Sequence, residues 1–283
     1  MAGTFGSGFT AYRGVRRLNA DGTRDATFDP GAFSGSIYAL ARAADGDLYV
    51  GGLFTTVNGT PAPRIVRLNP AGTIDTAFAP SSGFNEDVEQ IVAATDGSGD
   101  VYVGGRFTAY NGVTANHLIR LNADGTVDAG FATGAGFNAR TTSLSLAADG
   151  DLYVGGTFTS YNGSAAERII RLNPDGSVDA AFATGSGIPY GEVALAAARD
   201  GSGDVYVGGD FNAYNGAAAN RILRLNADGS VDAGFDVGAG VDGIVRFFLP
   251  LADGRVYLAG NISVFRETTV DFLARTKADG TVE

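Results

Sequence analysis

The sequence contains no cysteine and only one histidine, and these two shortages narrow the chemistry open to the chain. Without cysteine there is no disulfide framework and no thiolate nucleophile. The redox compartment stays open, because an exported protein can also do without cysteine. The single histidine, His117, cannot complete a Ser-His-acid triad or a histidine-rich metal site. We therefore expect no catalytic residues, no metal and no cofactor.

Positive charge and long apolar runs are scarce as well. Lysine and arginine total 20 against 31 acidic residues, which gives a formal net charge of −11. This charge repels a phosphate backbone and no basic cluster offsets it, so nucleic acid is not an expected partner. The longest apolar run, near residues 244–251, is interrupted by Arg246. The first residues lack a basic segment followed by an apolar run, so we expect no cleavable signal peptide and no membrane insertion.

What the sequence does contain is a repeat. The cassette VYVGGxFTxYNG…RLNxDGxVDxxF returns about every fifty residues, and a period of this size is typical of β-propeller blades. A residue that recurs in every repeat is expected to hold the blade together rather than to perform one reaction. The Arg-Leu-Asn triplets begin at Arg17, Arg67, Arg120, Arg171 and Arg224, with a degraded copy at Arg275.

A single repeat is consistent with a series of short strands. Residues 88–94, 101–103, 117–121 and 127–131 are apolar, β-branched or aromatic, and Asp-Gly or Asn-Gly pairs separate them. Such runs and turns indicate hairpins and meanders, and four strands per repeat make a propeller blade. No helical periodicity appears. We predict an all-β fold, a β-propeller of four-stranded blades.

The repeats divide the chain into a partial first repeat and five fuller ones in a single domain. Residues 8–12 occupy the FTxY position of the partial repeat. We favour a ring of five blades closed by pairing of the chain ends, with residues 23–28 supplying the outer strand of the last blade. A six-bladed ring whose first blade lacks its inner strand, a fragment, or an assembly that borrows a neighbour's strand are alternatives. The predicted boundaries are 1–35 for the partial repeat and about 36–86, 87–139, 140–190, 191–242 and 243–283 for the others.

Two recurring motifs invite a functional interpretation. Glycine pairs end the second strand, and we expect them to allow a bulge or the close approach of a neighbouring blade rather than to cradle phosphate, since no helix follows. The motif Asn-x-Asp-Gly-x-x-Asp resembles the middle of an EF-type calcium loop. Arginine holds its first ligand position and phenylalanine its twelfth, so we interpret the motif as a hairpin turn. It lies at Asn19/Asp21/Asp25, Asn122/Asp124/Asp128, Asn173/Asp175/Asp179 and Asn226/Asp228/Asp232.

The phrase RLNADGxVDxxF, seen in full at residues 120–131 and followed in each repeat by DGxxYVGGxFTxYNG, resembles the bacterial delta-sixty repeat. The resemblance covers nearly the whole chain. It implies a β-propeller-like fold of the kind found in large bacterial surface or secreted proteins and in some phage-encoded ones. It implies no agreed enzymatic activity and therefore transfers no catalytic residue.

The segments that link the repeats differ from one repeat to the next, and rings usually bind ligands through such loops. Their aromatic residues beside Asn, Asp and Arg are suited to stack on a sugar or to anchor a protein, although filling gaps between blades is the role that we favour for Phe84 and Phe137. In the last repeat, residues 246–250 and 261–267 replace small residues with bulky ones, as a terminal cap or, as we favour, a docking surface. The candidate ligand- or partner-binding residues are Phe84, Asn85, Asp87, Phe137, Asn138, Arg140, Tyr190, Asp242, Phe265 and Arg266.

From these observations we predict a non-catalytic β-propeller that serves as a structural or interaction module. Its expected partners are protein subunits of a larger assembly or a surface glycan. The lack of a visible signal or anchor favours a phage virion or tail component that contacts other subunits or the host, located in the virion or at a cell surface. The first alternative is an exported bacterial adhesin or carbohydrate-binding propeller, and the second is a hydrolase or lyase in the channel mouth.

Overall fold

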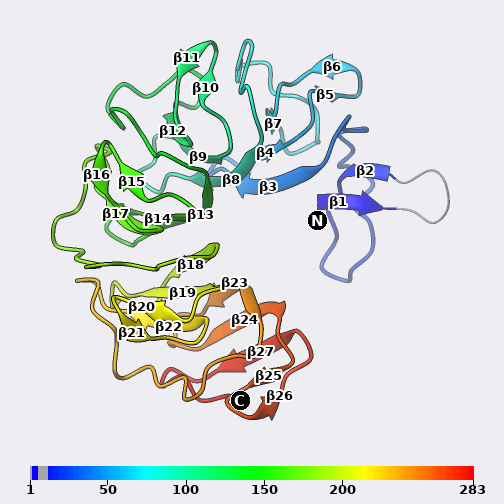
Figure 1. The fold of residues 1–283 in the computed structure, drawn as a ribbon. Helices are drawn as coiled ribbons and strands as arrows, with labels where there is room; N and C mark the ends of the chain where they lie inside the picture. Colours follow the sequence, from blue (N-terminus) through cyan, green and yellow to red (C-terminus); the bar gives the residue numbers. More distant parts are fainter. Residues whose placement is uncertain (1, 6–11) are drawn as a thin grey trace. The chain divides into compact units, whose positions relative to one another are not determined.

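The computed structural model describes residues 2–5 and 12–283, and every element in them is a β-strand (Figure 1). No helix in these ranges could cross a membrane. The contacts divide the chain into two compact units, one ending at Phe131 and the other spanning Ala132–Glu283. The all-β prediction is confirmed. The FTxY position predicted at residues 8–12 lies, except for Tyr12, outside the described residues.

Each of the five fuller repeats forms an antiparallel three-stranded sheet with its second strand in the centre. Successive sheets within a unit lie side by side (Figure 1). The partial first repeat forms a two-stranded sheet, β1 (Ala2–Phe5) with β2 (Tyr12–Val15). The other sheets of the first unit are β3 (Ile37–Arg42), β4 (Leu48–Gly52) and β7 (Ile65–Leu68), then β8 (Val88–Ala93), β9 (Val101–Gly105) and β12 (Leu118–Leu121). Those of the second unit are β13 (Thr141–Leu146), β14 (Leu152–Gly156) and β17 (Ile169–Leu172), then β18 (Val193–Ala197), β19 (Val205–Gly209) and β22 (Ile222–Leu225), then β23 (Ile244–Pro250), β24 (Val256–Asn261) and β27 (Leu273–Thr276).

Between the second and third strands of each of these sheets, the chain forms a hairpin whose two strands are each two residues long. Asn111 and Gly112 both adopt positive φ, 49° and 77°, as the two central residues of a type I′ turn require. The Asn-Gly turn predicted from the sequence is confirmed. The hairpins are β5 (Thr56–Val57) with β6 (Thr60–Pro61), β10 (Ala109–Tyr110) with β11 (Val113–Thr114), β15 (Ser160–Tyr161) with β16 (Ser164–Ala165), β20 (Ala213–Tyr214) with β21 (Ala217–Ala218), and β25 (Val264–Phe265) with β26 (Thr268–Thr269).

The predicted fourth strand is reduced to a single bridge. Of residues 127–131 only Val127 pairs, with Leu121. The Asp128 carboxylate accepts the N–H of Gly130 at 2.7 Å and bends the chain away from the sheet. Phe131 then turns inward and packs edge-on against Tyr102, with ring centroids 5.2 Å apart. The four-stranded blade is therefore corrected to three strands, a hairpin and a bridge.

The strand exchange predicted between the chain ends is also not what the structure shows. Arg24, within the segment 23–28, bridges Leu18 of its own repeat. Val282 bridges Thr276 of the last repeat and takes the outer position there. Each repeat thus supplies its own outer bridge.

Neighbouring repeats share their cores through a consistent face, which we call the forward face: the face of a sheet that packs on the following repeat. On β3, β4 and β7 it carries Tyr49, Gly51 and Ile65, and the following repeat contributes Val88 and Ile91 to the same core. Side chains alternate along a strand, so Val50 and Val66 point the other way, toward Val15 and Phe28 of the preceding repeat.

The glycine pair at 51–52 meets both needs predicted for it. A methyl group on Gly51 would lie 2.4 Å from Cγ1 of Val88, so this glycine lets the next sheet approach. One on Gly52 would lie 2.2 Å from the carbonyl oxygen of Ser36, beside the register shift between Ile37 and Ala39. The structural interpretation of the pair, a bulge and a close approach, is confirmed.

Candidate functional site

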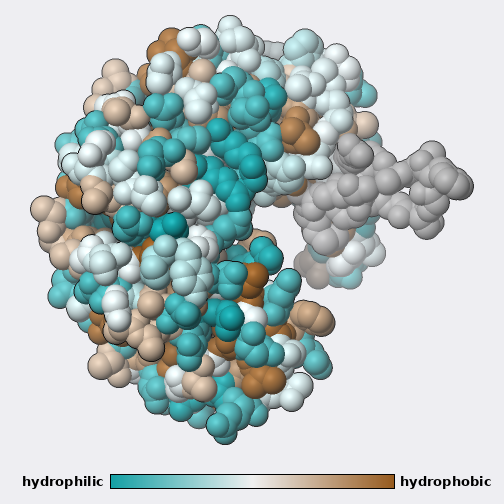
Figure 2. Space-filling view, in the orientation of Figure 1, coloured by the Kyte–Doolittle hydropathy of each residue, from teal (hydrophilic) through white to brown (hydrophobic). Residues whose placement is uncertain are grey.

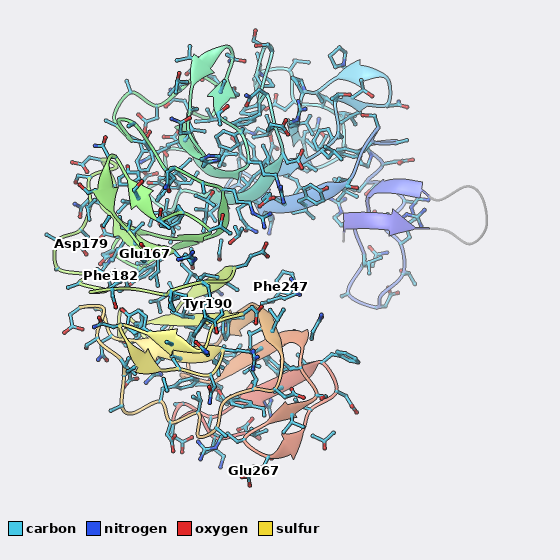
Figure 3. The ribbon with its side chains drawn as sticks, viewed as in Figure 1. Glu167, Asp179, Phe182, Tyr190, Phe247 and Glu267 are labelled. Carbon is cyan, nitrogen blue, oxygen red and sulfur yellow. The ribbon has the colours of Figure 1, made fainter. Side chains whose placement is uncertain are left out.

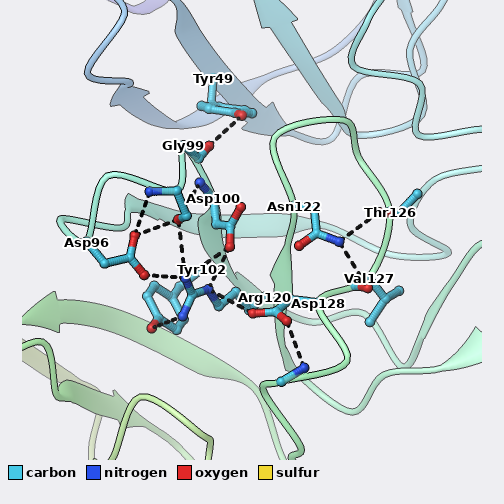
Figure 4. Close-up of polar contacts among 12 residues, drawn as sticks. Tyr49, Asp96, Gly99, Asp100, Tyr102, Arg120, Asn122, Thr126, Val127 and Asp128 are labelled. Carbon is cyan, nitrogen blue, oxygen red and sulfur yellow. Dashed lines mark hydrogen bonds and ion pairs between the residues drawn. The ribbon is translucent and has the colours of Figure 1, made fainter.

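In four of the Arg-Leu-Asn triplets the arginine lies among aspartates from separate turns, an arrangement that we call the arginine cage (Figure 4). In the second full repeat Nη2 of Arg120 lies 2.5 Å from Oδ2 of Asp96 and 3.0 Å from Oδ2 of Asp100. Its Nε lies 3.1 Å from Oδ2 of Asp128. The guanidinium carbon is 5.2 Å from the ring centre of Tyr102, within range for a cation–π contact.

The cage accounts for the motif that resembles a calcium loop. Its last aspartate, Asp128 in this repeat, faces the arginine, and Asp124 accepts the N–H of Thr126 at 2.9 Å and its hydroxyl at 2.7 Å. The hydroxyl of Thr126, followed by its N–H, lowers the pKa of Asp124. The carboxylates therefore serve the turn and the arginine, as the hairpin interpretation predicts. Nowhere in residues 2–5 and 12–283 do three or more His, Cys, Asp or Glu side chains gather in a metal-binding arrangement.

The cage also joins successive repeats within each unit. Nη1 of Arg67 donates to the carbonyl of Ala123 at 2.9 Å, and the Tyr49 hydroxyl donates to the carbonyl of Gly99 at 3.2 Å. In the second unit the Tyr153 hydroxyl donates to the carbonyl of Gly203 at 2.9 Å. Burial raises the pKa of both Tyr49 and Tyr153 to about 12, so neither phenol is a base at neutral pH. The repeated polar residues hold blades together.

Two of the predicted aromatic binders lie in the core. Phe84 and Phe137 are almost fully buried. The Phe84 ring centre lies 4.4 Å from that of Phe107 and 4.7 Å from that of Tyr110. Neither side chain offers a surface to a ligand, and the alternative role, filling a gap, describes their positions. Phe265 of the last repeat is fully buried as well.

Three of the predicted polar binders clamp the neighbouring hairpin. The amide oxygen of Asn85 accepts the N–H groups of Thr108 and Ala109, each at 3.0 Å. Asn138 makes the matching contacts to residues 159 and 160. Asp242 accepts the N–H groups of residues 263 and 264 at 2.9 Å, and hydrogen bonds from Ser263 and Val264, the Ser263 hydroxyl first, hold its pKa at about 2.

The predicted charged residues occupy separate places. Arg140 pairs with Glu192, and Arg266 lies 3.4 Å from a carboxylate oxygen of Asp236. Asp87 is partly buried, and its Oδ1 has no hydrogen-bond partner. Burial, followed by the charge of Glu86, raises its pKa. Arg140 and Arg266, both in the second unit, therefore pair with different acids.

Tyr190 is the aromatic residue among the predicted ten that stays open to solvent, with 44% of its surface exposed (Figure 3). The candidate list missed Phe247, Leu249 and Leu273, whose exposed fractions are 69%, 55% and 56%. The exchange of small for bulky residues at positions 246–250 was the sequence signal for them. Together with Phe248, Tyr257, Leu258 and Ala259 they line a shallow hollow of ≈ 320 Å³ on the last sheet.

Comparison with solved structures supports the fold. The chain resembles a structure of the mitotic checkpoint complex at 15% identity, over 98% of this chain and 73% of that chain, with a TM-score of 0.52. It resembles the surface component PorZ of the type-IX secretion system of Porphyromonas gingivalis at 13% identity, over 84% and 34%, with a TM-score of 0.51. The extracellular domain of a putative hybrid two-component system from B. thetaiotaomicron shares 12% identity over 91% and 29%, with a TM-score of 0.51. At such identities the likeness concerns the fold alone.

Sequence comparison identifies the family. No curated protein sequence matches the chain. The profile of a β-propeller domain of unknown function, DUF5122, matches six segments: residues 2–28, 43–78, 96–131, 147–182, 201–235 and 251–283. Since these segments cover well over half of the sequence and coincide with the repeats of the structure, the chain belongs to the DUF5122 β-propeller family.

Proposed function

We propose that the chain is a non-catalytic β-propeller module that binds a protein partner through its last repeat. One observation carries the proposal: exposed apolar side chains gather on the repeat that departs most from the shared pattern. Phe247, Leu249 and Leu273 surround the hollow there, whereas the matching surfaces of earlier repeats are covered. Exposed apolar groups that cluster in this way are typical of protein-binding sites.

The distribution of charged groups supports the non-catalytic part. The repeated acids are engaged by arginine or by their own turns, as Asp128 and Asp124 illustrate. The remaining predicted polar residues clamp hairpins or pair separately. Acid–base catalysis needs two groups with divided pKa values at one reacting position, and each unit holds only one of the predicted carboxylates, Asp87 in the first and Asp242 in the second.

A carbohydrate-binding propeller is the second candidate, because Tyr190 presents an aromatic surface to solvent. A glycan array and a panel of glycoside and ester substrates, run on the purified chain, separate the two. The protein-binding proposal expects no retained glycan and no turnover. Glycan binding that Tyr190→Ser abolishes and Phe247→Ser preserves would replace it with the carbohydrate alternative. Turnover that one carboxylate substitution removes would overturn its non-catalytic part.

The repeat type and the number of blades belong to the same proposal. The repeat is of the delta-sixty kind, on the motif given above, and six matched segments support six blades over five. Closure of the ring, which would cover the last face, is the competing prediction, and a place in a phage virion or tail or at a cell surface is a prediction as well.

A further inference from the structure

The forward face of the last sheet, formed by β23, β24 and β27, is exposed. Brown, apolar surface appears over this repeat in Figure 2, and Phe247 projects away from its own sheet in Figure 3. The opposite face is occupied: the Phe248 ring stacks 5.9 Å from that of Tyr206 in the preceding repeat. In earlier repeats of both units the forward face is the one that packs on a neighbour.

The side chains on this face are larger than those at the matching positions of earlier repeats. Phe247 pairs with Ala259, whereas Ala39 pairs with Gly51 and Ala194 with Gly208 in the same register. Two residues further along the strand, on the same face, Leu249 lies where the first full repeat has Ala41. The small residues let a following sheet seat closely, as the 2.4 Å distance at Gly51 shows. A sheet of the usual repeat type cannot approach the last face as closely, so this face suits a different neighbour.

Charge also restricts the neighbour. The chain carries a net charge of −11, so two copies repel each other over most of their surfaces. The hollow on the last sheet is lined by Phe247, Phe248, Leu249, Tyr257, Leu258, Ala259 and Leu273, and none of these residues is charged. Here two copies can meet without placing like charges against each other. Two layers of large apolar side chains also match the ordinary spacing of about 10 Å between packed sheets.

We propose that this forward face pairs with the same face of a second copy of the chain, about a two-fold axis. Such an interface uses one self-complementary patch, and Phe247 and Leu249 are its central anchors. The proposal rests on the proposed function and names the partner of that same surface.

Single cysteines test the pairing cleanly, because the chain contains none of its own. Phe247→Cys, Leu249→Cys and Leu273→Cys are made separately in the full chain, and a short bis-maleimide is added at low protein concentration. Val113→Cys is the matched control, since Val113 is 66% exposed on the hairpin β10–β11 of another repeat. We expect covalent dimers from at least two of the face variants and at least tenfold less from the control. Adding Phe247→Ser to Leu273→Cys should remove most of the cross-linking.

Cross-linking no greater than that of Val113→Cys would overturn the second copy as partner. The reaction of the same variants with a monofunctional maleimide then separates two failures. Rapid labelling means that the face is open, so the protein-binding module survives and its partner is a different protein. Slow labelling in a monomer, with the cysteine unreactive until the chain is unfolded, means that the chain covers this face itself. Ring closure is then the explanation, and the proposed function fails too.

Discussion

Arg120 holds three carboxylates that belong to different turns: Asp96 and Asp100 between β8 and β9, and Asp128 after β12. Its guanidinium supplies the positive charge that a cation would supply in an EF-type loop, and its planar fork serves several acceptors at once. The side chains of Arg120 and Asp100 are only 9% and 10% exposed, so the loss of one partner leaves the other as an unpaired buried charge. This residue-scale arrangement recurs around Arg67, Arg171 and Arg224.

Replacement of the cage arginine should be costly. We expect Arg120→Met to lower the free energy of unfolding by about 3 kcal/mol, since the aspartates lose their counter-charge. Urea denaturation followed by circular dichroism measures this. Arg255→Met is the control: Arg255 and Asp253 form an exposed pair that water and salt screen, so its loss should cost far less. Equal effects of the two substitutions would contradict the structural role of the cage.

Asp96 should make the free energy of unfolding sensitive to acid. The hydroxyl and N–H of Ser98, with Arg120, hold its pKa at about 2, below the ordinary value near 4. A folded-state pKa that is lowered contributes stability above about pH 4, and this contribution disappears as the pH falls toward 2. The stability difference between the wild type and Asp96→Asn should therefore be constant near neutrality and shrink between about pH 4 and pH 2. A difference that stays constant over this range, in urea titrations at each pH, would refute the assignment.

At the scale of elements, one polar residue in the preceding linker positions four of the five hairpins. Asn85, Asn138 and Asp242 do this with side-chain oxygens that accept two successive N–H groups, and Ser34 does it with its hydroxyl. Ser, Asn and Asp are interchangeable here because each offers an acceptor at similar reach. The variation that made these linkers look like binding loops is variation among equivalent clamps.

Exchange at one clamp tests this explanation. Asn85→Ala should lower the free energy of unfolding by about 1–2 kcal/mol, because two hairpin N–H groups lose their acceptor. Asn85→Asp should restore most of it, since the last repeat already uses aspartate at the matching position. Thermal unfolding of the three proteins gives the order. An aspartate variant as unstable as the alanine variant would show that the acceptor is not what matters.

The strands, their order and the turns could be predicted from the sequence, because apolar runs and Asn-Gly or Asp-Gly pairs repeat at fixed spacing. The shortened outer strand could not, since it depends on Asp128 bending the chain and on Phe131 packing against Tyr102. The prediction of the binding residues failed for a related reason, because the local sequence does not reveal whether a side chain is buried. A phenylalanine beside polar residues, such as Phe84, gives the same pattern whether it binds a ligand or fills the core. Phe247 was signalled only by its departure from the repeat.

At the scale of the whole molecule, the five fuller repeats share one plan of strands, hairpin and bridge, and the last of them differs at its forward face. There Phe247, Leu249 and Leu273 are exposed, whereas the first full repeat buries Ala39, Ala41 and Ile65 at the matching positions against its neighbour. A partner that covers this face would complete the pattern that the other repeats follow. Whether this surface binds a partner therefore decides the role of the last repeat.

The mass of the chain in solution tests this claim most directly. Light scattering coupled to size-exclusion chromatography, over a hundredfold range of concentration, should give a mass that rises from 28.9 kDa toward twice that value. Phe247→Ser should hold the mass at that of the monomer, and Val113→Ser should behave as the wild type does. A wild-type mass that stays at 28.9 kDa throughout the range would contradict the pairing of two copies through the last repeat.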